Sequence, residues 1–170
     1  MKLLIDTSIL IEAERDSFDL AGLENDAEEV FICDAGVTEF LQGQPVKDEG
    51  KRQRWRAFLE AVIEPMPSLP LDRAACEMAG SLMYQARRRS HTSNLGDGLH
   101  AGVAKLHDLT VVTLDEDHFK ALGIATYNPM ASRRTPHQAA SLMTPHASCG
   151  ETRTRLHARR SRFAAWRSAI

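Results

Sequence analysis

Strand-like and helix-like segments alternate along the first 129 residues of this 170-residue chain. Short runs of mostly aliphatic side chains cover residues 2–5, 30–33, 110–114 and 124–127. Such runs are typical of strands buried on both faces, as in a parallel sheet. Helix-like stretches separate them, so we expect an α/β fold with a mainly parallel sheet flanked by helices.

Apolar residues at helical spacing mark the segments between the strands. In the clearest example, Trp55, Phe58, Leu59 and Val62 fall at i, i+3, i+4 and i+7, which is one face of a helix. Three prolines between residues 65 and 70 end that helix. Further helices are predicted at 8–15, in a stretch ending near 43, and at 75–89, 97–107 and 116–122.

Charge is divided unevenly between two regions of the chain. Residues 1–129 carry 13 Lys and Arg against 22 Asp and Glu, a net charge of −9, whereas residues 130–170 carry 8 Arg and one Glu, a net charge of +7. Such different balances indicate two separate units. We therefore predict a folded domain at 1–129 and an Arg-rich, disordered tail at 130–170, with a nucleic-acid-binding arm as the alternative for the tail.

Composition argues against several classes of protein. No stretch approaches the roughly 18 apolar residues of a transmembrane helix, so no membrane association is expected. The first ten residues include Lys2 and Asp6 and lack the long apolar core of a signal peptide, which predicts a cytoplasmic protein. Three scattered cysteines without a CxxC pair argue against a disulfide framework and a zinc knuckle.

Acidic residues stand close to the points where the predicted strands end. Asp6 and Asp115 directly follow two of the strands, Glu39 lies on the helix after the second strand, and Asp97 opens a helix of small residues. The carboxyl ends of parallel strands meet at one edge of a sheet, so these side chains are expected to converge. Gathered carboxylates repel one another unless a divalent cation neutralises them, and oxygen ligands favour Mg²⁺, with Mn²⁺ as an alternative, over zinc. Water held by such an ion can attack a phosphoester, so the pattern points to metal-assisted hydrolysis.

Four motifs that hold these acids occur in series along the chain. They lie in the stretches LLIDTSILIE at 3–12, VTEFLQG at 37–43 and GDGLHAGVAKLHDLTVVTLDEDHF at 96–119, the last of which contains two motifs. In order and spacing they resemble the PIN domain, and more narrowly the VapC-type ribonuclease toxins of bacterial toxin–antitoxin pairs. The resemblance runs across roughly residues 2–127 and implies a PIN-like three-layer fold.

The resemblance also implies a function for each matching residue. Asp6, Glu39, Asp97 and Asp115 would form the catalytic cluster, with Asp6 and Asp97 as ligands of Mg²⁺. Neighbouring hydroxyl groups would support these acids through hydrogen bonds, namely those of Thr7, Ser8 and Thr113.

Activity and partners follow from the same resemblance. Family members cut single-stranded or looped RNA, leave a 5′-phosphate and a 3′-hydroxyl, are silenced by a cognate antitoxin and commonly dimerise. The chain is therefore expected to be an Mg²⁺-dependent endoribonuclease, with RNA as substrate, an antitoxin protein as partner and a homodimeric assembly.

The sequence departs from the family pattern at three places. The helix opened by Asp97 continues in the family with an aliphatic residue and two alanines, whereas here it continues with Leu99, His100, Ala101 and Gly102. We interpret His100 as a partly buried, hydrogen-bonded histidine, with contact to the site or to RNA as the alternative. Asp117 is an additional acid that either joins the site or begins the next helix. The family pattern ends near Asn128, so the basic tail has no counterpart in it.

Two other functions compete with the nuclease. A phosphatase of the haloacid dehalogenase type also begins with an apolar strand and an Asp, but it needs a second Asp two residues later as general acid, where this chain has Ser8. A non-catalytic PIN-like binding module would keep the fold and lose turnover. The presence of all four acids gives that module little support.

Several side chains outside the motifs have both a structural and a functional interpretation. The basic residues within 51–56 and 87–89 either contact RNA phosphates or form solvated helix faces. The helical spacing of Trp55 and Phe58 favours a place in the core or a dimer interface over stacking on bases. The polar segment 91–94 is expected to cap the helix that follows it.

Overall fold

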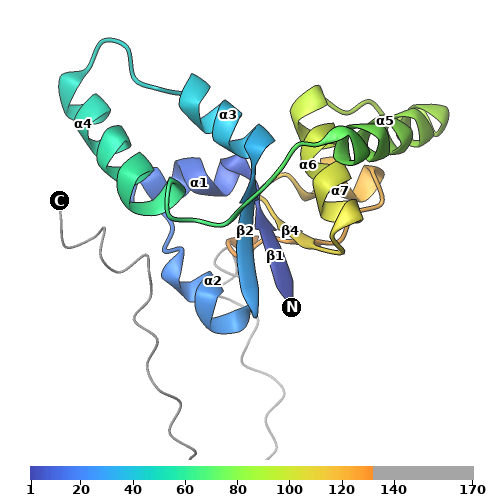
Figure 1. Cartoon of the computed structure of the whole chain (residues 1–170), viewed down its shortest axis with the longest axis horizontal. Coiled ribbons are helices and arrows are strands. Elements are labelled where there is room, and N and C mark those ends of the chain that lie inside the picture. The colour runs from blue at the N-terminus through green and yellow to red at the C-terminus, as the bar shows by residue number, and fades with distance from the viewer. Residues whose placement is uncertain (132–170) are drawn as a thin grey trace, which may run out of the picture.

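A five-stranded sheet forms the centre of the computed structural model, which describes residues 1–131 (Figure 1). Its strand order is β3-β2-β1-β4-β5, and every neighbouring pair is parallel. The predicted α/β class with a mainly parallel sheet is therefore confirmed. The strands are β1 (Lys2–Ile5), β2 (Glu29–Cys33), β3 (Ser68–Leu69), β4 (Thr110–Val112) and β5 (Thr126–Tyr127).

Helices cover both faces of this sheet and so make three layers (Figure 1). The layer on one face is built mainly by α1 (Thr7–Glu14), α2 (Ala21–Asp26), α4 (Glu49–Phe58) and the short π-helix η1 (Leu59–Ile63). The layer on the other face is built by α5 (Arg73–Arg88), α6 (Leu95–Leu106) and α7 (Glu116–Ala121). Helix α3 (Asp34–Gln42) contributes side chains to both layers.

The central strand β1 is buried on both faces. Leu3 and Ile5 point into the core beneath α1 and α4, whereas Leu4 points into the core beneath α5 and α6, and none of the three is exposed. In β4, Val112 and Val111 divide between the two cores in the same way. Because both faces of these strands are buried, their sequences are continuous apolar runs and do not alternate between apolar and polar residues.

The aromatic residues of α4 belong to the first of these cores. Trp55 is 6% exposed and Phe58 is fully buried. The Phe40 ring of α3 stacks on Trp55 at a centroid distance of 5.3 Å and packs against Phe58 at 5.5 Å. The core position predicted from their helical spacing is confirmed, and burial leaves neither ring free to stack on a nucleobase.

Some elements are not predicted by the sequence pattern. Strand β3 has only two residues between Pro67 and Pro70, too few to show a periodicity, yet it pairs with β2. Helix α2 has six residues in a polar segment that gives no helical pattern. Helix α4 continues into η1, whose residues Val62 and Ile63 stay buried on the same side.

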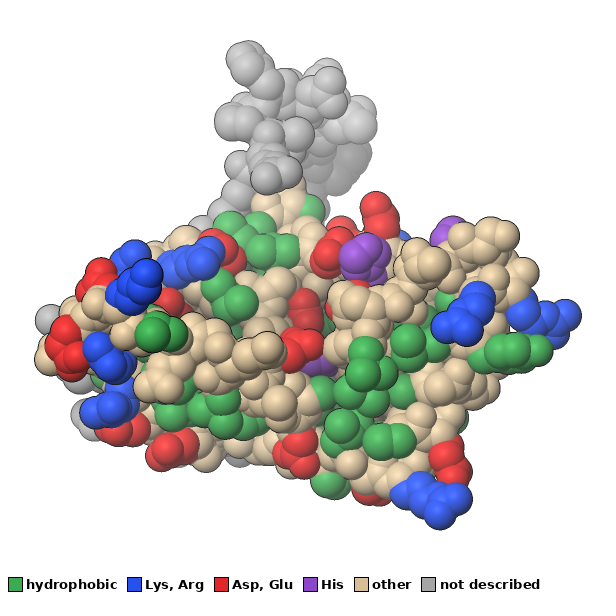
Figure 2. Space-filling view, turned by 90° about the horizontal axis from the view of Figure 1, so that it is seen from above, with side chains coloured by type: hydrophobic (Ala, Val, Ile, Leu, Met, Phe, Trp, Pro, Cys, Tyr) green, Lys and Arg blue, Asp and Glu red, His purple; other side chains and the backbone are tan. Residues whose placement is uncertain are grey.

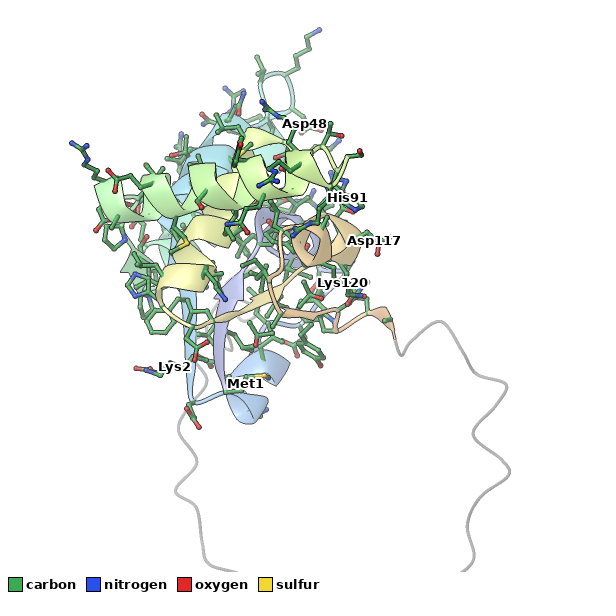
Figure 3. The ribbon with its side chains drawn as sticks, turned by 90° about the vertical axis from the view of Figure 1, so that its right-hand side faces the viewer. Met1, Lys2, Asp48, His91, Asp117 and Lys120 are labelled. Carbon is green, nitrogen blue, oxygen red and sulfur yellow. The ribbon has the colours of Figure 1, made fainter. Side chains whose placement is uncertain are left out.

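The carboxyl ends of the strands lie at one end of the molecule. Figure 3 shows Met1 and Lys2, at the amino end of β1, in the lower part of the view, and Asp48, His91 and Asp117 in the upper part. Helices α1, α3 and α7 begin within a few residues of a strand end, so their first turns stand at this upper end. The site described below is built there.

The predicted Arg-rich tail lies almost entirely outside the described residues, which end at residue 131. Met130 packs against the first core. The boundary at residue 129 and the character of the tail stay predictions. Within residues 1–131, the helices lack the combination of length and apolar character that a membrane-spanning segment requires.

Candidate metal centre

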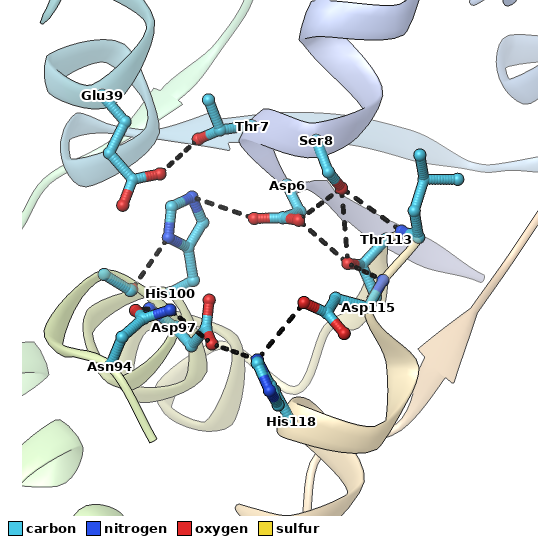
Figure 4. A network of polar contacts seen from close by, with 12 residues as sticks. Asp6, Thr7, Ser8, Glu39, Asn94, Asp97, His100, Thr113, Asp115 and His118 are labelled. Atoms are coloured by element: carbon cyan, nitrogen blue, oxygen red, sulfur yellow. Dashed lines mark hydrogen bonds and ion pairs between the residues drawn. The ribbon is translucent and has the colours of Figure 1, made fainter. Parts of the chain in front are cut away.

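Asp6 lies at the carboxyl end of β1, directly before α1, and is 7% exposed. Its Oδ2 atom accepts hydrogen bonds from Ser8 Oγ at 2.6 Å and from Thr113 Oγ1 at 2.9 Å. Ser8 Oγ in turn accepts a hydrogen bond from the backbone N–H of Leu114 at 3.2 Å. The two hydroxyls hold one carboxylate oxygen and leave Oδ1 directed toward His100 (Figure 4).

Glu39 reaches the same place from α3, the helix that follows β2. Thr7 Oγ1 donates a hydrogen bond of 2.6 Å to Glu39 Oε2. A Cβ atom on Gly96 would overlap Glu39 Oε1, so glycine at that position lets Glu39 lie against the start of α6. Together with the bonds from Ser8 and Thr113, the Thr7 contact confirms the predicted support of the acids by hydroxyl groups.

Asp97 lies in the first turn of α6, two residues after the helix begins at Leu95. The helix starts earlier than predicted because Asn94 caps it, with Asn94 Oδ1 accepting from the Asp97 N–H at 2.7 Å. This confirms that the polar segment 91–94 serves as a cap. Burial raises the pKa of the Asp97 carboxyl, and the Asp6 carboxylate acts in the same direction, against the hydrogen bond from His118. Asp6 and Asp97 are therefore close enough to interact through their charges.

His118 joins two of the predicted acids. Its Nδ1 atom lies 2.9 Å from Asp97 Oδ2 and 3.3 Å from Asp115 Oδ2 (Figure 4). The Asp115 N–H donates to Thr113 Oγ1 at 2.9 Å, which fixes the start of α7 beside β4. Sequence reasoning missed His118, although its position three residues after Asp115 places both on one helix face.

His100 is fully buried on α6, between the acids and the helix backbone. Its Nδ1 atom lies 3.0 Å from the Gly96 carbonyl oxygen, and its Nε2 atom lies 3.9 Å from Asp6 Oδ1. Burial opposes a charge on the ring, but contacts with Cys33, Asp6 and the Gly96 carbonyl outweigh it and raise the pKa of His100 to about 9. The ring is thus the hydrogen-bonded histidine that we expected, fully rather than partly buried, and also a neighbour of the site.

Three of these side chains stand close enough to share one cation. Asp6, Glu39 and His100 each offer a ligand atom, and these atoms lie within 4.8 Å of one another. Asp97 and Asp115 fall outside this group and meet at His118 instead. Asp117 is exposed in the first turn of α7 and points outward (Figure 3). The sharing of an ion by Asp6 and Asp97 stays a prediction.

The surface around the site is divided by charge. Figure 2 shows acidic and histidine side chains in the middle of this face and basic side chains toward its two ends. Beside Glu39, a pocket of about 410 Å³ lies between α1, α3 and α4. Its wall includes three basic side chains, those of Arg15, Lys51 and Arg54.

The Thr113 hydroxyl is the buried connection between Asp6 and Asp115, which allows a test of the network by stability. We expect Thr113→Val to lower the free energy of unfolding by about 1–3 kcal/mol, because it removes the donor to Asp6 and the acceptor of the Asp115 N–H without changing the size of the side chain. Thr110→Val, at the start of the strand that directly precedes Thr113, is the control and should change stability by less than about 0.5 kcal/mol. Urea unfolding measures both, and equal effects would contradict the network.

The chain matches a known protein family. A model of the PIN domain matches residues 3–124. Among curated proteins, Ribonuclease VapC of Rickettsia bellii is 28% identical over 123 residues, which are 72% of this chain and 91% of that protein. Toxin FitB of Neisseria gonorrhoeae is 29% identical over 106 residues, which are 60% of this chain and 76% of that protein.

Solved structures show the same architecture. The crystal structure of FitAcB from Neisseria gonorrhoeae matches with a TM-score of 0.67 and 26% identity, covering 76% of this chain and 99% of that one. VapBC2 from Rickettsia felis, solved with a DNA fragment from its promoter, matches with a TM-score of 0.66 and 20% identity over 75% of this chain and 98% of that one. Because VapBC2 is only 20% identical to this chain, that match shows a shared fold and nothing more.

Proposed function

This chain belongs to the PIN domain family, and from that membership we propose that it is a divalent-metal-dependent endoribonuclease acting as the toxin of a toxin–antitoxin pair. The observation that carries the proposal is the meeting of Asp6 and Glu39, with His100, within ligand-sharing distance at the carboxyl edge of the sheet. Of the two curated relatives described above, one is named as a ribonuclease and the other as a toxin. We place the activity in the cytoplasm.

The residues present suit a divalent cation. Asp6 and Glu39 each engage one carboxylate oxygen with a hydroxyl and keep the other oxygen available. His100 adds a buried nitrogen, Nε2, that has no hydrogen-bond partner. We propose Asp6 and Asp97 as ligands of Mg²⁺ or Mn²⁺, with Glu39, which lies within ligand-sharing distance of Asp6, as a further ligand. A cation bound there would neutralise the acids and stabilise negative charge on the phosphate during hydrolysis.

The chain's own groups would orient the reactants and move the proton. Water loses a proton as it adds to phosphorus, the bond to the 3′-oxygen breaks, and that oxygen takes up a proton from solvent, which leaves a 5′-phosphate and a 3′-hydroxyl. A carboxylate oxygen of the cluster that does not hold the ion would take the proton from water. His118 Nδ1, at 2.9 Å from Asp97 Oδ2 and with its side chain 45% exposed, can relay the proton to solvent. Asp115 would hold the His118 ring in place.

The basic side chains beside the site support a nucleic acid substrate. The domain is acidic overall, so it needs local positive charge to hold a phosphate backbone. Lys51 and Arg54 supply that charge on the pocket wall next to Glu39. We propose that they hold phosphates that flank the scissile bond.

Neither alternative function gains support. Ser8 donates a hydrogen bond to Asp6 from the position where a haloacid-dehalogenase mechanism would need its second Asp. A non-catalytic binding module would not need the hydroxyl groups that hold Asp6 and Glu39. We further propose a cognate antitoxin as partner, since one solved structure with this fold is VapBC-5 from Mycobacterium tuberculosis, a member of the VapBC family of toxin-antitoxin systems. We propose a homodimer as the assembly.

Removal of the metal tests the nuclease directly. We expect the purified protein to cut single-stranded or looped RNA with Mg²⁺, to stop when EDTA is in excess, and to recover when Mg²⁺ is restored. Gel electrophoresis of end-labelled RNA measures cleavage, and mapping of the ends should give 5′-phosphates. Cleavage that persists in EDTA would rule out the metal-dependent mechanism. Metal binding without cleavage of any RNA in a total cellular preparation would favour the binding module.

A further inference from the structure

The His100 ring presents an unpartnered nitrogen to the acidic centre. Its Nδ1 is held by the Gly96 carbonyl at 3.0 Å, which fixes the orientation of the ring on α6. Its Nε2 is buried without a hydrogen-bond partner and faces the carboxylate of Asp6 (Figure 4). A buried polar atom without a partner at hydrogen-bond distance is costly, so Nε2 is a candidate for binding a group from outside the protein chain. Imidazole binds a metal ion only as the neutral ring, so an ion bound at Nε2 would displace the proton of this nitrogen to solvent.

We propose that His100 Nε2 is a nitrogen ligand of the metal ion, together with Asp6 and Glu39, and that this site therefore prefers Mn²⁺ to Mg²⁺. The proposal rests on the proposed function, because it concerns the ion of the same centre. Imidazole is a ligand of intermediate softness that transition metals accept readily, whereas Mg²⁺ favours oxygen and gives up its waters reluctantly. The prediction of Mg²⁺ from the sequence assumed oxygen ligands alone.

Distances between the three ligand atoms suit a shared ion. Ligands at about 2.1 Å from one octahedral ion lie about 3 Å apart when adjacent and about 4.2 Å apart when opposite. Nε2 of His100 and Oδ1 of Asp6, at 3.9 Å, fall within this limit, whereas the set with Glu39, which lies within 4.8 Å, would draw together by up to about 0.6 Å around an ion. The Asp6 oxygen that faces Nε2 is Oδ1, which Ser8 and Thr113 leave free, and Thr7 likewise binds only Oε2 of Glu39.

Gly36 on α3 provides the space that the His100 ring occupies. A Cβ atom at this position would stand 2.9 Å from His100 Nε2 and 3.6 Å from Thr7 Oγ1. An alanine there would press on the proposed ligand atom and leave every donor group of the site unchanged. A substitution at Gly36 is therefore a second way to displace His100 Nε2 without replacing the histidine itself.

Metal binding to the RNA-free protein tests the proposal. We expect His100→Gln to weaken Mn²⁺ binding at least about tenfold in calorimetry and to affect Mg²⁺ much less, because glutamine offers an oxygen in place of the nitrogen. Electron spin-echo envelope modulation of bound Mn²⁺ should show nitrogen coupling in the unmodified protein. The coupling should vanish in His100→Gln and persist in His118→Gln, which removes the neighbouring imidazole.

A second variant covers the case in which His100→Gln fails to fold. Gly36→Ala should fold, as judged by circular dichroism and thermal melting, and should lower the preference for Mn²⁺ over Mg²⁺. Stronger Mn²⁺ binding by His100→Gln would overturn the proposal, since it would mean that the ring acts only as a positive charge competing with the ion. Equal losses for both ions, or coupling that disappears in His118→Gln, would overturn it as well.

The two proposals fail in different ways. Mn²⁺ bound without nitrogen coupling would contradict the role of His100 and leave the metal-dependent nuclease intact. Absence of any divalent binding to the unmodified protein would contradict both. Both outcomes are obtained from metal binding alone, without an assay of RNA cleavage.

Discussion

We expect Asp6→Asn to lower the rate of RNA cleavage by about 10²- to 10³-fold, a loss of several kcal/mol in transition-state stabilisation. Asp6 has the central position in the site. Its Oδ2 accepts hydrogen bonds from Ser8 and Thr113, and its Oδ1 lies 3.9 Å from His100 Nε2. Asparagine is nearly the same size and its carbonyl can accept both hydroxyl bonds. The substitution therefore removes the charge that binds the cation and keeps the geometry.

Stability separates a catalytic loss from a folding defect in this variant. The pKa of Asp97 is raised partly by the Asp6 carboxylate, so removing that charge relieves repulsion between two acids in the apo protein. The same charge also stabilises the protonated His100 ring, an attraction that the variant loses. Because these two effects oppose each other, we expect the melting temperature of Asp6→Asn to stay close to that of the unmodified protein.

Asp117→Asn is the matched control for Asp6→Asn. It removes the same charge from an exposed position two residues after Asp115. We expect Asp117→Asn to retain full cleavage. Nuclease activity that survives in purified Asp6→Asn at the level of the unmodified protein would exclude Asp6 from the mechanism and point to a contaminating enzyme.

The convergence of the acids could be predicted because it depends on topology. Once the sheet is parallel, residues after β1 and β4 must stand at the same edge, which places Asp6 and Asp115 together. Glu39 needed more than topology, since its reach depends on the rotation of α3 and on the absence of a side chain at Gly96. The resemblance to the PIN motifs predicted that Glu39 belongs to the site, whereas sequence spacing alone did not determine its position.

The histidines of the site could not be placed from the sequence, for a physical reason. His100 occupies a buried helix position, and which way its Nε2 points is set by the Gly96 carbonyl on the same helix and by the gap at Gly36 on another. His118 follows helical spacing from Asp115, but its contact with Asp97 joins α7 to α6 across the fold. Such contacts between distant elements leave no periodic signal.

Short elements escaped prediction because tertiary contacts form them. The two residues of β3 gain their strand character only by pairing with Ile32 and Cys33 of β2. The π-helical turn η1 continues α4 with one extra residue per turn, a feature that keeps Val62 and Ile63 in the core. Helix and strand propensity and hydrophobic spacing predict neither the pairing of β3 nor the π-helical turn, whereas they do identify long elements such as α5.

The second large effect is expected from an added methyl group between α5 and α6. A Cβ atom at Gly102 would stand 2.5 Å from the carbonyl oxygen of Ala75 and 2.8 Å from the N and Cβ atoms of Ala79. These are backbone or short side-chain atoms, so the helices themselves must move apart. Overpacking of this kind costs about 1–3 kcal/mol, more than the roughly 1 kcal/mol that alanine gains over glycine in a helix.

Gly80→Ala provides a control of opposite sign within α5. No atom lies within 4 Å of the Cβ position at Gly80, so only the gain in helix propensity remains, about 0.5–1 kcal/mol. Gly102→Ala should therefore lower the melting temperature and Gly80→Ala should raise it, by about 2–4 °C for each kcal/mol. Differential scanning calorimetry measures both, and an increase in both variants would contradict the tight contact.

This contact also bears on the chemistry, because α6 carries Asp97 and His100 toward Asp6. A helix pushed away from α5 has to tilt or slide over the sheet, and either movement changes the 3.9 Å separation between His100 Nε2 and Asp6 Oδ1. Gly102→Ala should thus reduce RNA cleavage and Mn²⁺ affinity below the melting temperature, where the protein is still folded. Gly80→Ala should leave both unchanged. A destabilised Gly102→Ala protein with full activity would show that the position of α6 is set by its capped amino end, at Asn94, rather than by its packing on α5.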